Sequence, residues 1–369
     1  MKLLLLSDHS SSHTIKWANS LSNEKDSVCI FGLSSYNKNV YNNNIKIYSV
    51  GFNPDRMRDV KSFSKFYYLK ALPVLKKIIK EFNPDILHAH YATSYGLLGA
   101  LSGFHPFIIS VWGSDIFDFP KKSILHKLVL KYNLSKADKI LSTSSAMAVE
   151  TQLYTSKKIE ITPFGVDLDV FKKNDVKNLF NKNDIVIGTV KALEKDYGID
   201  YLIKAFGIIK NKYPELSIKL LIVGGGSLEN NLKLLCKELD IKNHTIFTGK
   251  IDFAKVPDYY NMLDVYVALS NNESFGVAII EALACEKPVV VSNVGGLPEI
   301  VKNEHTGLIV PAKDTKKLAL AIERLIMDKN LRTTLGENGR KRVIKYFNWK
   351  DNVQQMIGIY NALIEKNKK

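Results

Sequence analysis

The chain has 369 residues, 46% of them hydrophobic, and its formal net charge of +15 comes from 52 Lys and Arg against 37 Asp and Glu. This length exceeds what one hydrophobic core usually holds, so we expect two domains. No apolar run approaches the roughly 18 residues that cross a bilayer, and Asp8 and His9 follow Leu3–Leu6 at once, so we expect neither a membrane-spanning helix nor a signal peptide.

The net charge and the cysteines indicate the kind of partner and the cellular location. The excess of positive charge indicates an anionic partner, which is a nucleic acid, a membrane surface or a phosphorylated substrate. The three cysteines are odd in number, far apart and without metal-ligand spacing. They are Cys29, Cys236 and Cys285. A reducing cytoplasm is therefore the expected location.

The first half of the chain alternates strand-like and helical patterns. Lys2–Ser7 predicts a strand, and a polar loop, Asp8–His13, leads into a helix at Thr14. Six further apolar runs predict strands at Val28–Leu33, Ile45–Val50, Ile86–His90, Phe107–Trp112, Lys139–Ser144 and Ile159–Phe164. This alternation predicts a mostly parallel sheet with helices on both faces.

Several residues near the carboxyl ends of these strands are candidate site residues, because open α/β sheets bind ligands there. His88 and His90 end one strand and point to the same face of the sheet. Trp112-Gly113-Ser114-Asp115 ends the next strand, and His13 lies in the first loop. The alternatives are a structural His pair, a Trp packed in the core and a solvated loop.

Two segments are unusually basic. Arg56–Lys80 carries eight Lys or Arg against one acid, with Phe and Tyr between them, and Lys121–Lys139 carries six against one acid. Such surfaces suit an anionic bilayer. A core-facing stripe and a solvated face are the alternatives. In the first segment the expected contact residues are Lys61, Lys65, Lys76 and Lys80.

The first domain is expected to end near residue 166. Asp167 and Asp169 follow, and although such a pair can bind Mg²⁺, that ion also needs substrate phosphate beside it. We therefore expect a linker here and no metal site. The polar stretch Lys172–Asn183 marks the boundary, which predicts one domain at residues 1–166 and a second at residues 184–348.

The second half repeats the alternation of strand and helix. Its predicted strands are Ile185–Lys191, Leu220–Val223, Thr245–Lys250, Val265–Leu269 and Gly307–Val310. Gly224-Gly225-Gly226 predicts a turn with a close approach, but the spaced glycine pattern of dinucleotide sites is absent.

The most informative stretch begins at Leu269, where a buried strand ends. A polar loop follows, and Val277–Cys285 has the composition of a helix. Glu273 lies in the loop and Glu281 about one turn into the helix. At the helix start, an anion site is offered by the backbone N–H groups of Ser274, Phe275, Gly276 and Val277. The layout suits a nucleotide sugar, with amides for the diphosphate and carboxylates for sugar and ribose hydroxyls; two solvated glutamates are the alternative.

This stretch resembles the E-x7-E motif of the retaining family 4 glycosyltransferases, including Ser-Phe-Gly after Glu273 and Lys-Pro-Val-Val after the helix. Trp112-Gly113-Ser114-Asp115 resembles the His-Gly-x-Asp element of that family, and Pro163–Phe171 resembles its exit from the first domain. The resemblance covers essentially the whole chain. It implies an α/β fold of the GT-B type, in which two Rossmann-like doubly wound domains face each other across a cleft and residues 349–369 form a helix that crosses back to the first domain.

The resemblance also implies roles in donor binding. Glu273 is expected to contact the transferred sugar and Glu281 the ribose, while Gly249 borders the nucleobase. The diphosphate is expected at Lys191, where the family usually has Arg. Tyr197 stands where the family has Lys, so Lys195 is the candidate for the second cation.

In the first domain Trp112 replaces the usual His of the family. The candidate catalytic groups besides Glu273 are therefore Asp115 and His90, with His13 able to compensate, and the candidate acceptor contacts are His13 and Trp112. A further departure is Glu286, where a Gly is usual.

These observations predict a retaining glycosyltransferase that moves a sugar from a nucleoside-diphosphate sugar to an acceptor hydroxyl, with no metal, no cofactor and no nucleic-acid partner. The expected acceptor is a glycan, in particular a lipid-linked one in surface polysaccharide synthesis such as lipopolysaccharide or capsule. The expected location is the inner face of the membrane. The alternatives are a non-catalytic membrane-surface or nucleic-acid-binding protein with the same fold, and a nicotinamide-dependent oxidoreductase, which the missing glycine fingerprint disfavours.

Overall fold

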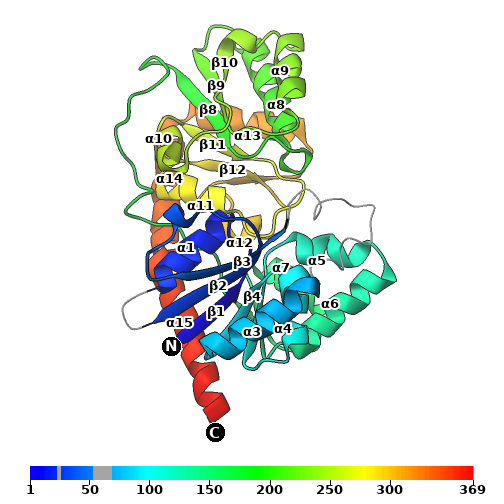
Figure 1. Cartoon of the computed structure of the whole chain (residues 1–369). Coiled ribbons are helices and arrows are strands. Elements are labelled where there is room, and N and C mark those ends of the chain that lie inside the picture. Colours follow the sequence, from blue (N-terminus) through cyan, green and yellow to red (C-terminus); the bar gives the residue numbers. More distant parts are fainter. Residues whose placement is uncertain (23–25, 53–68, 369) are drawn as a thin grey trace. The chain divides into compact units, whose positions relative to one another are not determined.

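The structure, a computed structural model, describes residues 1–22, 26–52 and 69–368. It divides into two compact units, unit 1 comprising Met1–Pro163 with Asp351–Lys369 and unit 2 comprising Phe164–Lys350 (Figure 1). Most of the basic segment Arg56–Lys80, including Lys61 and Lys65, lies outside the described residues. Among the helices that are described, none combines the length and the hydrophobicity needed to cross a bilayer.

Unit 1 contains a parallel sheet with the strand order β3-β2-β1-β4-β5-β6-β7. The strands are β1 (Lys2–Leu6), β2 (Ser27–Ser34), β3 (Lys46–Phe52), β4 (Ile86–His90), β5 (Phe107–Val111), β6 (Lys139–Ser142) and β7 (Ile159–Ile161). Leu3–Leu6 is wholly buried, because a parallel sheet is covered on both faces and its central strands are apolar throughout. The strand order changes direction between β1 and β4.

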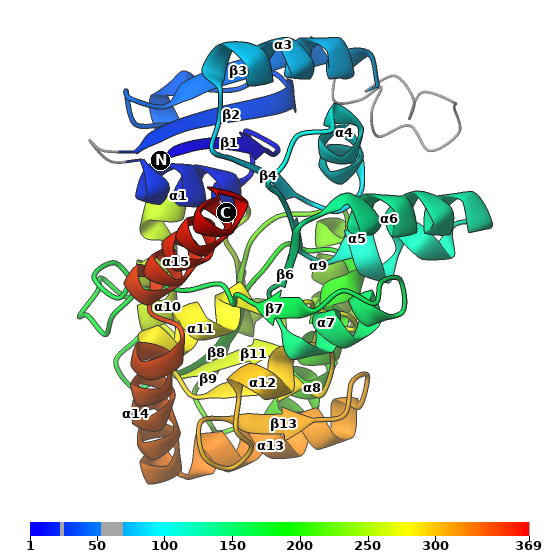
Figure 2. The same cartoon turned by 90° about the horizontal axis from the view of Figure 1, so that it is seen from below.

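Helices cover both faces of this sheet. One face packs against α3 (Leu72–Phe82), α4 (Ser94–Ser102), α6 (Ile124–Lys136) and α7 (Ser145–Gln152). Right-handed crossovers place α1 (Ser12–Leu21) on the opposite face. That face also receives α15 (Trp349–Lys368), because Tyr360 of this helix is hydrogen-bonded to His88 (Figure 2). A short helix, α5 (Ser114–Phe117), follows β5.

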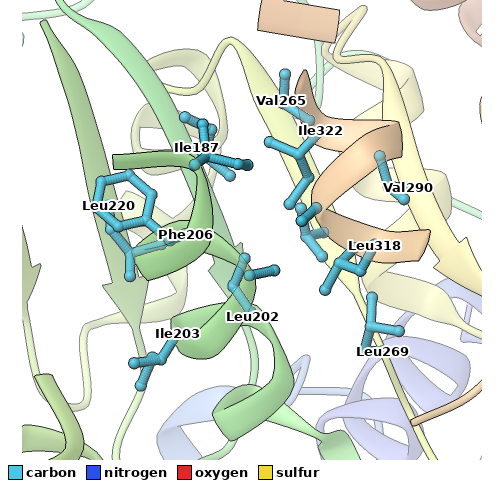
Figure 3. Packing of buried hydrophobic residues seen from close by; sticks show 14 of the residues in the cluster. Ile187, Leu202, Ile203, Phe206, Leu220, Val265, Leu269, Val290, Leu318 and Ile322 are labelled. Carbon is cyan, nitrogen blue, oxygen red and sulfur yellow. The ribbon is translucent and has the colours of Figure 1, made fainter. Parts of the chain in front are cut away.

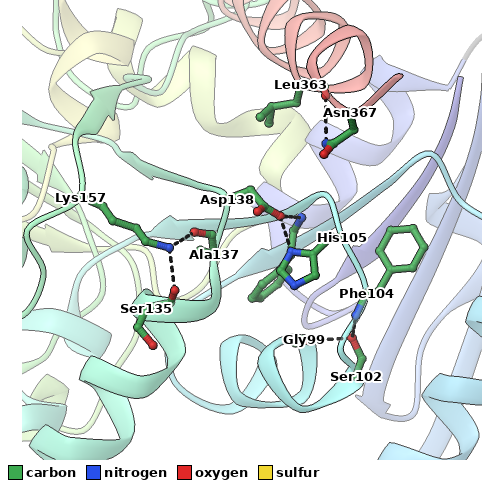
Figure 4. Close-up of polar contacts among 11 residues, drawn as sticks. Gly99, Ser102, Phe104, His105, Ser135, Ala137, Asp138, Lys157, Leu363 and Asn367 are labelled. Carbon is green, nitrogen blue, oxygen red and sulfur yellow. Dashed lines mark hydrogen bonds and ion pairs between the residues drawn. The ribbon is translucent and has the colours of Figure 1, made fainter. Parts of the chain in front are cut away.

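Polar contacts close the end of unit 1 where β5 and β6 begin (Figure 4). The Asp138 carboxylate accepts from the backbone N–H of Phe107 at 2.7 Å and lies 2.7 Å from His105 Nδ1. Lys157 Nζ donates to the carbonyls of Ser135 and Ala137 at 2.6 and 2.5 Å. A lysine at this position satisfies the last carbonyl groups of α6 and opposes the negative end of its dipole.

Unit 2 contains a second parallel sheet, with the order β10-β9-β8-β11-β12-β13. The strands are β8 (Ile185–Val190), β9 (Ile218–Val223), β10 (Thr245–Phe247), β11 (Val265–Ala268), β12 (Val289–Ser292) and β13 (Leu308–Val310). The core on one face is formed with α8 (Ile199–Lys212), α9 (Glu229–Glu238) and α13 (Thr315–Met327) (Figure 3). The crossovers put α10 (Val256–Asn261), α11 (Val277–Ala284) and α12 (Leu297–Ile300) on the other face, where α14 (Lys329–Tyr346) packs against α11.

Both sheets are doubly wound, and the prediction of two Rossmann-like α/β domains is confirmed. Unit 2 begins at Phe164 instead of residue 184, and the reason is the packing of two buried phenylalanines. The ring of Phe164 lies 5.9 Å from that of Phe275, and the ring of Phe171 lies 6.1 Å from that of Tyr260. The segment expected to be a linker is therefore part of the fold of the second domain.

The departure at Glu286 has a structural consequence that leads to a stability prediction. Glu286 follows α11 with a φ of +59°, a left-handed conformation that costs a residue with a Cβ roughly 1 kcal/mol. We expect the Glu286→Gly variant to be about 1 kcal/mol more stable than Glu286→Ala in urea unfolding, because both lose the surface ion pair with Lys173 (3.0 Å) and only glycine relieves the strain. Equal stability of the two variants would contradict this explanation.

Candidate active site

The second domain brings two predicted residues together where its strand order changes direction. β8 and β11 are neighbours in the sheet, and their helices leave on opposite faces, which opens a crevice at the carboxyl ends of the strands. Lys191 follows β8 and Glu273 follows β11, and Lys191 Nζ donates to Glu273 Oε2 at 2.7 Å. The side chains are 18% and 14% exposed, so the pair is shielded but remains accessible to a ligand.

Two further side chains contact this ion pair. The Lys191 ammonium lies 4.3 Å from the centre of the Tyr197 ring, a cation–π contact. Ser270 Oγ lies 3.4 Å from Glu273 Oε2. Tyr197 was not predicted as a contact residue; the sequence marked it only as the residue that stands in place of a lysine.

The two loops that carry the pair are tied to each other. Asn271 donates its backbone N–H to the Asp196 carbonyl at 2.7 Å and its side-chain amide to the Lys195 carbonyl at 3.0 Å. Lys195 itself is exposed in this loop. On the other side of Glu273, a Cβ at Gly295 would lie 1.8 Å from the Glu273 carbonyl oxygen, so only glycine permits the close approach that fixes the loop.

Glu281 projects from α11, five residues into the helix that starts at Val277. Gly276 is its N-cap and provides no side-chain cap, and the positive end of the helix dipole favours an anion at this position. Phe275, the residue before it, is buried between the rings of Phe164 and Phe347. That packing holds the loop at the start of the helix.

A buried tyrosine, Tyr260, orients the Glu281 carboxylate. Tyr260 on α10 donates its hydroxyl to Glu281 Oε2 at 2.9 Å. Burial raises the pKa of Tyr260 well above its usual value, so the phenol keeps the proton that it donates. Sequence reasoning missed Tyr260, which has no motif around it.

The predicted donor residue Gly249 lies at the edge of the second sheet, directly after β10. Its carbonyl accepts a hydrogen bond from Gly224 N at 3.1 Å.

The first domain has a corresponding cluster where its strand order changes direction between β1 and β4. Ser7 follows β1, and its Oγ lies 3.0 Å from Nδ1 of His90 at the end of β4. The ring of Trp112, after β5, lies 4.4 Å from that of His90 and meets those of His13 and Tyr91 edge-on at 5.8 Å. The structure therefore brings together His13, His90 and Trp112, which were predicted separately.

Tyr91 is a residue of this cluster that sequence reasoning missed. Its φ of +80° is a strained conformation for a bulky residue, and such strain gathers at functional sites. Its backbone N–H donates to the Ser110 carbonyl at 3.0 Å, so the strand pairing holds it in place. Nothing in the local sequence signals the strain.

The two histidines on β4 are both buried and neutral near pH 7. Burial lowers the pKa of His88 to about 3, and burial, with a smaller contribution from His88, lowers the pKa of His90 well below its usual value. His88 Nδ1 and Nε2 lie 2.8 Å from the hydroxyls of Tyr360 and Ser110, which gives it a structural role. His90 is 3% exposed. As a neutral ring it can donate a hydrogen bond from one nitrogen and accept one at the other.

Asp115 is buried and holds two strand ends together. Its Oδ2 accepts from the N–H of Ala92 at 2.9 Å, and its Oδ1 accepts from Gly113 and Trp112 at 2.8 and 3.2 Å. Burial raises the pKa of this carboxyl against the opposing effect of the backbone N–H groups. The geometry is that of a residue that positions the loops after β4 and β5.

The Asp167 and Asp169 side chains have local partners. Asp167 Oδ1 accepts from the Asp169 N–H at 2.9 Å, and Asp169 Oδ2 pairs with Lys350 at 3.0 Å. Across the described ranges, no group of three or more His, Cys, Asp or Glu is arranged to hold a metal ion.

Both halves of the chain match families of known proteins. The family model described as Glycosyl transferase 4-like matches residues 2–144, and the model described as Glycosyl transferases group 1 matches residues 170–342. An uncharacterized glycosyltransferase of Methanocaldococcus jannaschii is 29% identical over 342 residues, which cover 90% of this chain and 89% of the relative. The N-acetyl-alpha-D-glucosaminyl L-malate synthase of Bacillus anthracis is 26% identical over 84% of each chain.

A relative from capsule synthesis and two solved structures complete the comparison. The capsular polysaccharide biosynthesis glycosyltransferase CapM of Staphylococcus aureus is 34% identical over 66% of this chain and 61% of the relative. Sucrose-phosphate synthase from Thermosynechococcus elongatus superposes with a TM-score of 0.83 at 23% identity, covering 99% and 100% of the two chains. Anabaena HepE in complex with UDP gives 0.80 at 17% identity, covering 98% and 100%. With glycosyltransferase models matching both halves and the GT-B fold shared with these structures, the chain belongs to the family 4 glycosyltransferases.

Proposed function

We propose that this glycosyltransferase transfers a sugar from a nucleoside-diphosphate sugar to an acceptor hydroxyl with retention of configuration and without a metal ion. The observation that carries the proposal is the shielded Lys191–Glu273 pair at the crevice of the second domain, with Glu281 on the adjoining helix. The UDP bound by the structural neighbour HepE supports a donor of this class.

The proposed roles follow from charge. The Lys191 ammonium and the N–H groups at the start of α11 stabilise the diphosphate as it leaves, which is usually the largest contribution in this kind of chemistry. Glu281 binds the ribose, and Glu273 binds the hydroxyls of the transferred sugar. Because these groups supply positive charge to the diphosphate, a divalent ion is not needed.

Retention is proposed from the resemblance to the retaining family 4 glycosyltransferases. Because Glu273 is engaged by Lys191 and is not poised to attack the sugar carbon, we propose a single same-face step in place of a covalent glycosyl intermediate. The acceptor hydroxyl then reacts on the face that the diphosphate leaves, and the departing phosphate oxygen takes its proton. His90, a neutral ring beside Trp112, and His13 are proposed to contact the acceptor.

The test is to incubate the protein with a panel of nucleotide sugars in excess EDTA and to follow sugar release or transfer by proton NMR. We expect turnover of one donor class, with the anomeric configuration of the donor kept in the transfer product. An inverted product would contradict retention, and an absolute requirement for Mg²⁺ or Mn²⁺ would contradict the metal-free site. Failure to turn over or bind any donor would favour a non-catalytic protein.

Glu281 is expected to act in donor binding rather than in the chemical step. We expect Glu281→Ala to raise the donor KM by about 10- to 30-fold with little change in kcat, because a ribose contact is equally strong in the ground and transition states. Tyr260→Phe, which removes the hydrogen bond that orients Glu281, is expected to raise KM by only about 3-fold. Steady-state kinetics over a range of donor concentrations separates the effect on KM from the effect on kcat in both variants. A fall in kcat without a rise in KM for Glu281→Ala would contradict the assignment.

The acceptor is proposed to be lipid-linked, and the surface that supports this is α6 of the first domain. Ile124, Leu125 and Leu128 are 71%, 56% and 55% exposed on this helix, and lysines at 127 and 131 lie among them, also exposed. An apolar stripe flanked by lysines suits the interface of an anionic bilayer. The name of the relative CapM supports a role in polysaccharide synthesis.

Liposome sedimentation checks this surface. We expect binding that rises with anionic lipid and falls with salt. It should weaken about 30-fold in Lys127→Gln/Lys131→Gln, since each lysine near an anionic surface is worth about 1 kcal/mol. It should weaken by a comparable amount in Ile124→Gln/Leu128→Gln, which removes the apolar stripe. Leu234→Gln, at a leucine 59% exposed on α9, is the matched control and should bind like the wild type. Binding that ignores lipid charge and both α6 variants would leave a soluble acceptor as the better proposal.

A further inference from the structure

The aromatic ring of Tyr197 is part of the donor site through its contact with Lys191. The Lys191 ammonium lies between two partners, the Glu273 carboxylate at 2.7 Å and the face of the Tyr197 ring at 4.3 Å. A carboxylate takes one of the three ammonium protons along a defined direction. The π face attracts the same charge without taking a hydrogen bond away, so it restricts where the ammonium can lie and leaves protons for another acceptor.

The position of this ring is fixed by the backbone around it. Tyr197 closes a short turn in which its N–H donates to the Glu194 carbonyl at 3.1 Å. The next residue, Gly198, has a φ of +62° and lies so close to Leu269 that a Cβ would stand 2.2 Å from the Leu269 carbonyl oxygen. The ring also packs against the core of the second domain. The ring therefore does not have to be ordered when a ligand arrives.

We propose that Tyr197 is a positioning residue for the donor diphosphate, acting through Lys191. It rests on the proposed function, because a diphosphate is the anion that Lys191 is proposed to bind. In the free protein the ring and Glu273 hold the ammonium in place; when a diphosphate binds, the ammonium shares its remaining protons with the phosphate oxygens while the ring keeps it oriented. The phenol hydroxyl has no part in this role.

Isothermal titration calorimetry with UDP, GDP, ADP and inorganic pyrophosphate tests the proposal. For the diphosphate that the wild type binds, we expect Tyr197→Phe to keep the affinity within about 2-fold, because it keeps the ring, and Tyr197→Leu to weaken it by about 3- to 30-fold. In a Lys191→Met background, Tyr197→Leu should cause no further loss, since the ring then has no cation to hold.

Tyr201→Leu is the matched control. Tyr201 also carries a lysine over its ring, with Lys204 Nζ at 5.2 Å, and it packs against the same core outside the donor site. This variant should bind diphosphate like the wild type, which separates a loss of the contact from a general loss of packing. Thermal unfolding of each variant without ligand shows that it is folded.

The outcomes separate the two proposals. Wild-type binding of a diphosphate together with full affinity in Tyr197→Leu, or an equal loss in Tyr197→Phe and Tyr197→Leu, would overturn the role of the ring and leave the glycosyltransferase proposal standing. An additive loss in the Lys191→Met background would show that Tyr197 does not act through Lys191. Failure of the wild type to bind any of the four probes would overturn both.

Discussion

Replacing Glu273 with alanine is expected to lower kcat by about 100- to 1,000-fold while leaving the donor KM nearly unchanged, the size of effect seen when one group that stabilises a transition state is removed. Glu273 is the carboxylate held at the crevice by Lys191, and its contacts to the sugar strengthen as positive charge develops on the ring. Its loss also frees the Lys191 ammonium for the diphosphate, so binding is not expected to weaken.

The matched variant is Glu273→Gln, which keeps the shape and removes the charge. We expect it to retain hydrogen bonds to the sugar hydroxyls and to fall between the wild type and Glu273→Ala in kcat. Steady-state and single-turnover kinetics with the donor found in the nucleotide-sugar screen provide the measurement. A rise in KM with kcat intact in both variants would show that Glu273 only binds the donor and is not used in the chemical step.

Lys191→Met is expected to weaken nucleoside-diphosphate binding by about 100-fold and to lower kcat as well. The variant removes the cation proposed for the diphosphate and leaves Glu273 without its partner at 2.7 Å, and a shielded carboxylate without a partner repels the same anion. Lys191→Arg keeps the charge and should recover most of the affinity, although its planar fork meets the ring of Tyr197 differently.

Lys204→Met is the control for that experiment. Lys204 also pairs with a carboxylate, Asp200 at 2.8 Å, and also lies over a tyrosine ring, but it is on α8 outside the crevice. Calorimetry should show wild-type diphosphate binding for Lys204→Met. Similar losses in Lys204→Met and Lys191→Met would indicate a general effect of charge rather than a site at Lys191.

The sequence predicted the strands other than β12 because each is a short apolar run bounded by polar turns. It did not predict strand order, and strand order is what puts the end of β8 beside the end of β11. Lys191 and Glu273 were therefore predicted as members of one site without their direct contact. In the first domain His90 was predicted, but Ser7, which contacts it, was not.

Contacts between distant segments account for the residues that were missed. Tyr260 lies on a different helix from Glu281, and neither periodicity nor a motif links them. The pair His88 and His90 was correctly expected to share one face, and their rings lie 4.8 Å apart. The sequence did not predict the hydrogen bond between His88 and Tyr360, which lies 272 residues further along, because that contact depends on where α15 packs.

The role of Asp115 could not be predicted from its motif. A Gly-x-Asp pattern does not distinguish a carboxylate that reacts from one that accepts hydrogen bonds from backbone N–H groups.

The measurement that bears most directly on the proposed donor site is thermal unfolding of the wild type and of Lys191→Met with UDP, GDP and ADP and their sugar derivatives. We expect one nucleotide class to raise the midpoint of the wild type by roughly 5 °C at about 100 times its Kd, and to raise that of Lys191→Met by no more than about 1 °C at the same concentration. Equal stabilisation of both proteins, or no stabilisation of the wild type by any nucleotide, would contradict a diphosphate site at Lys191 and Glu273.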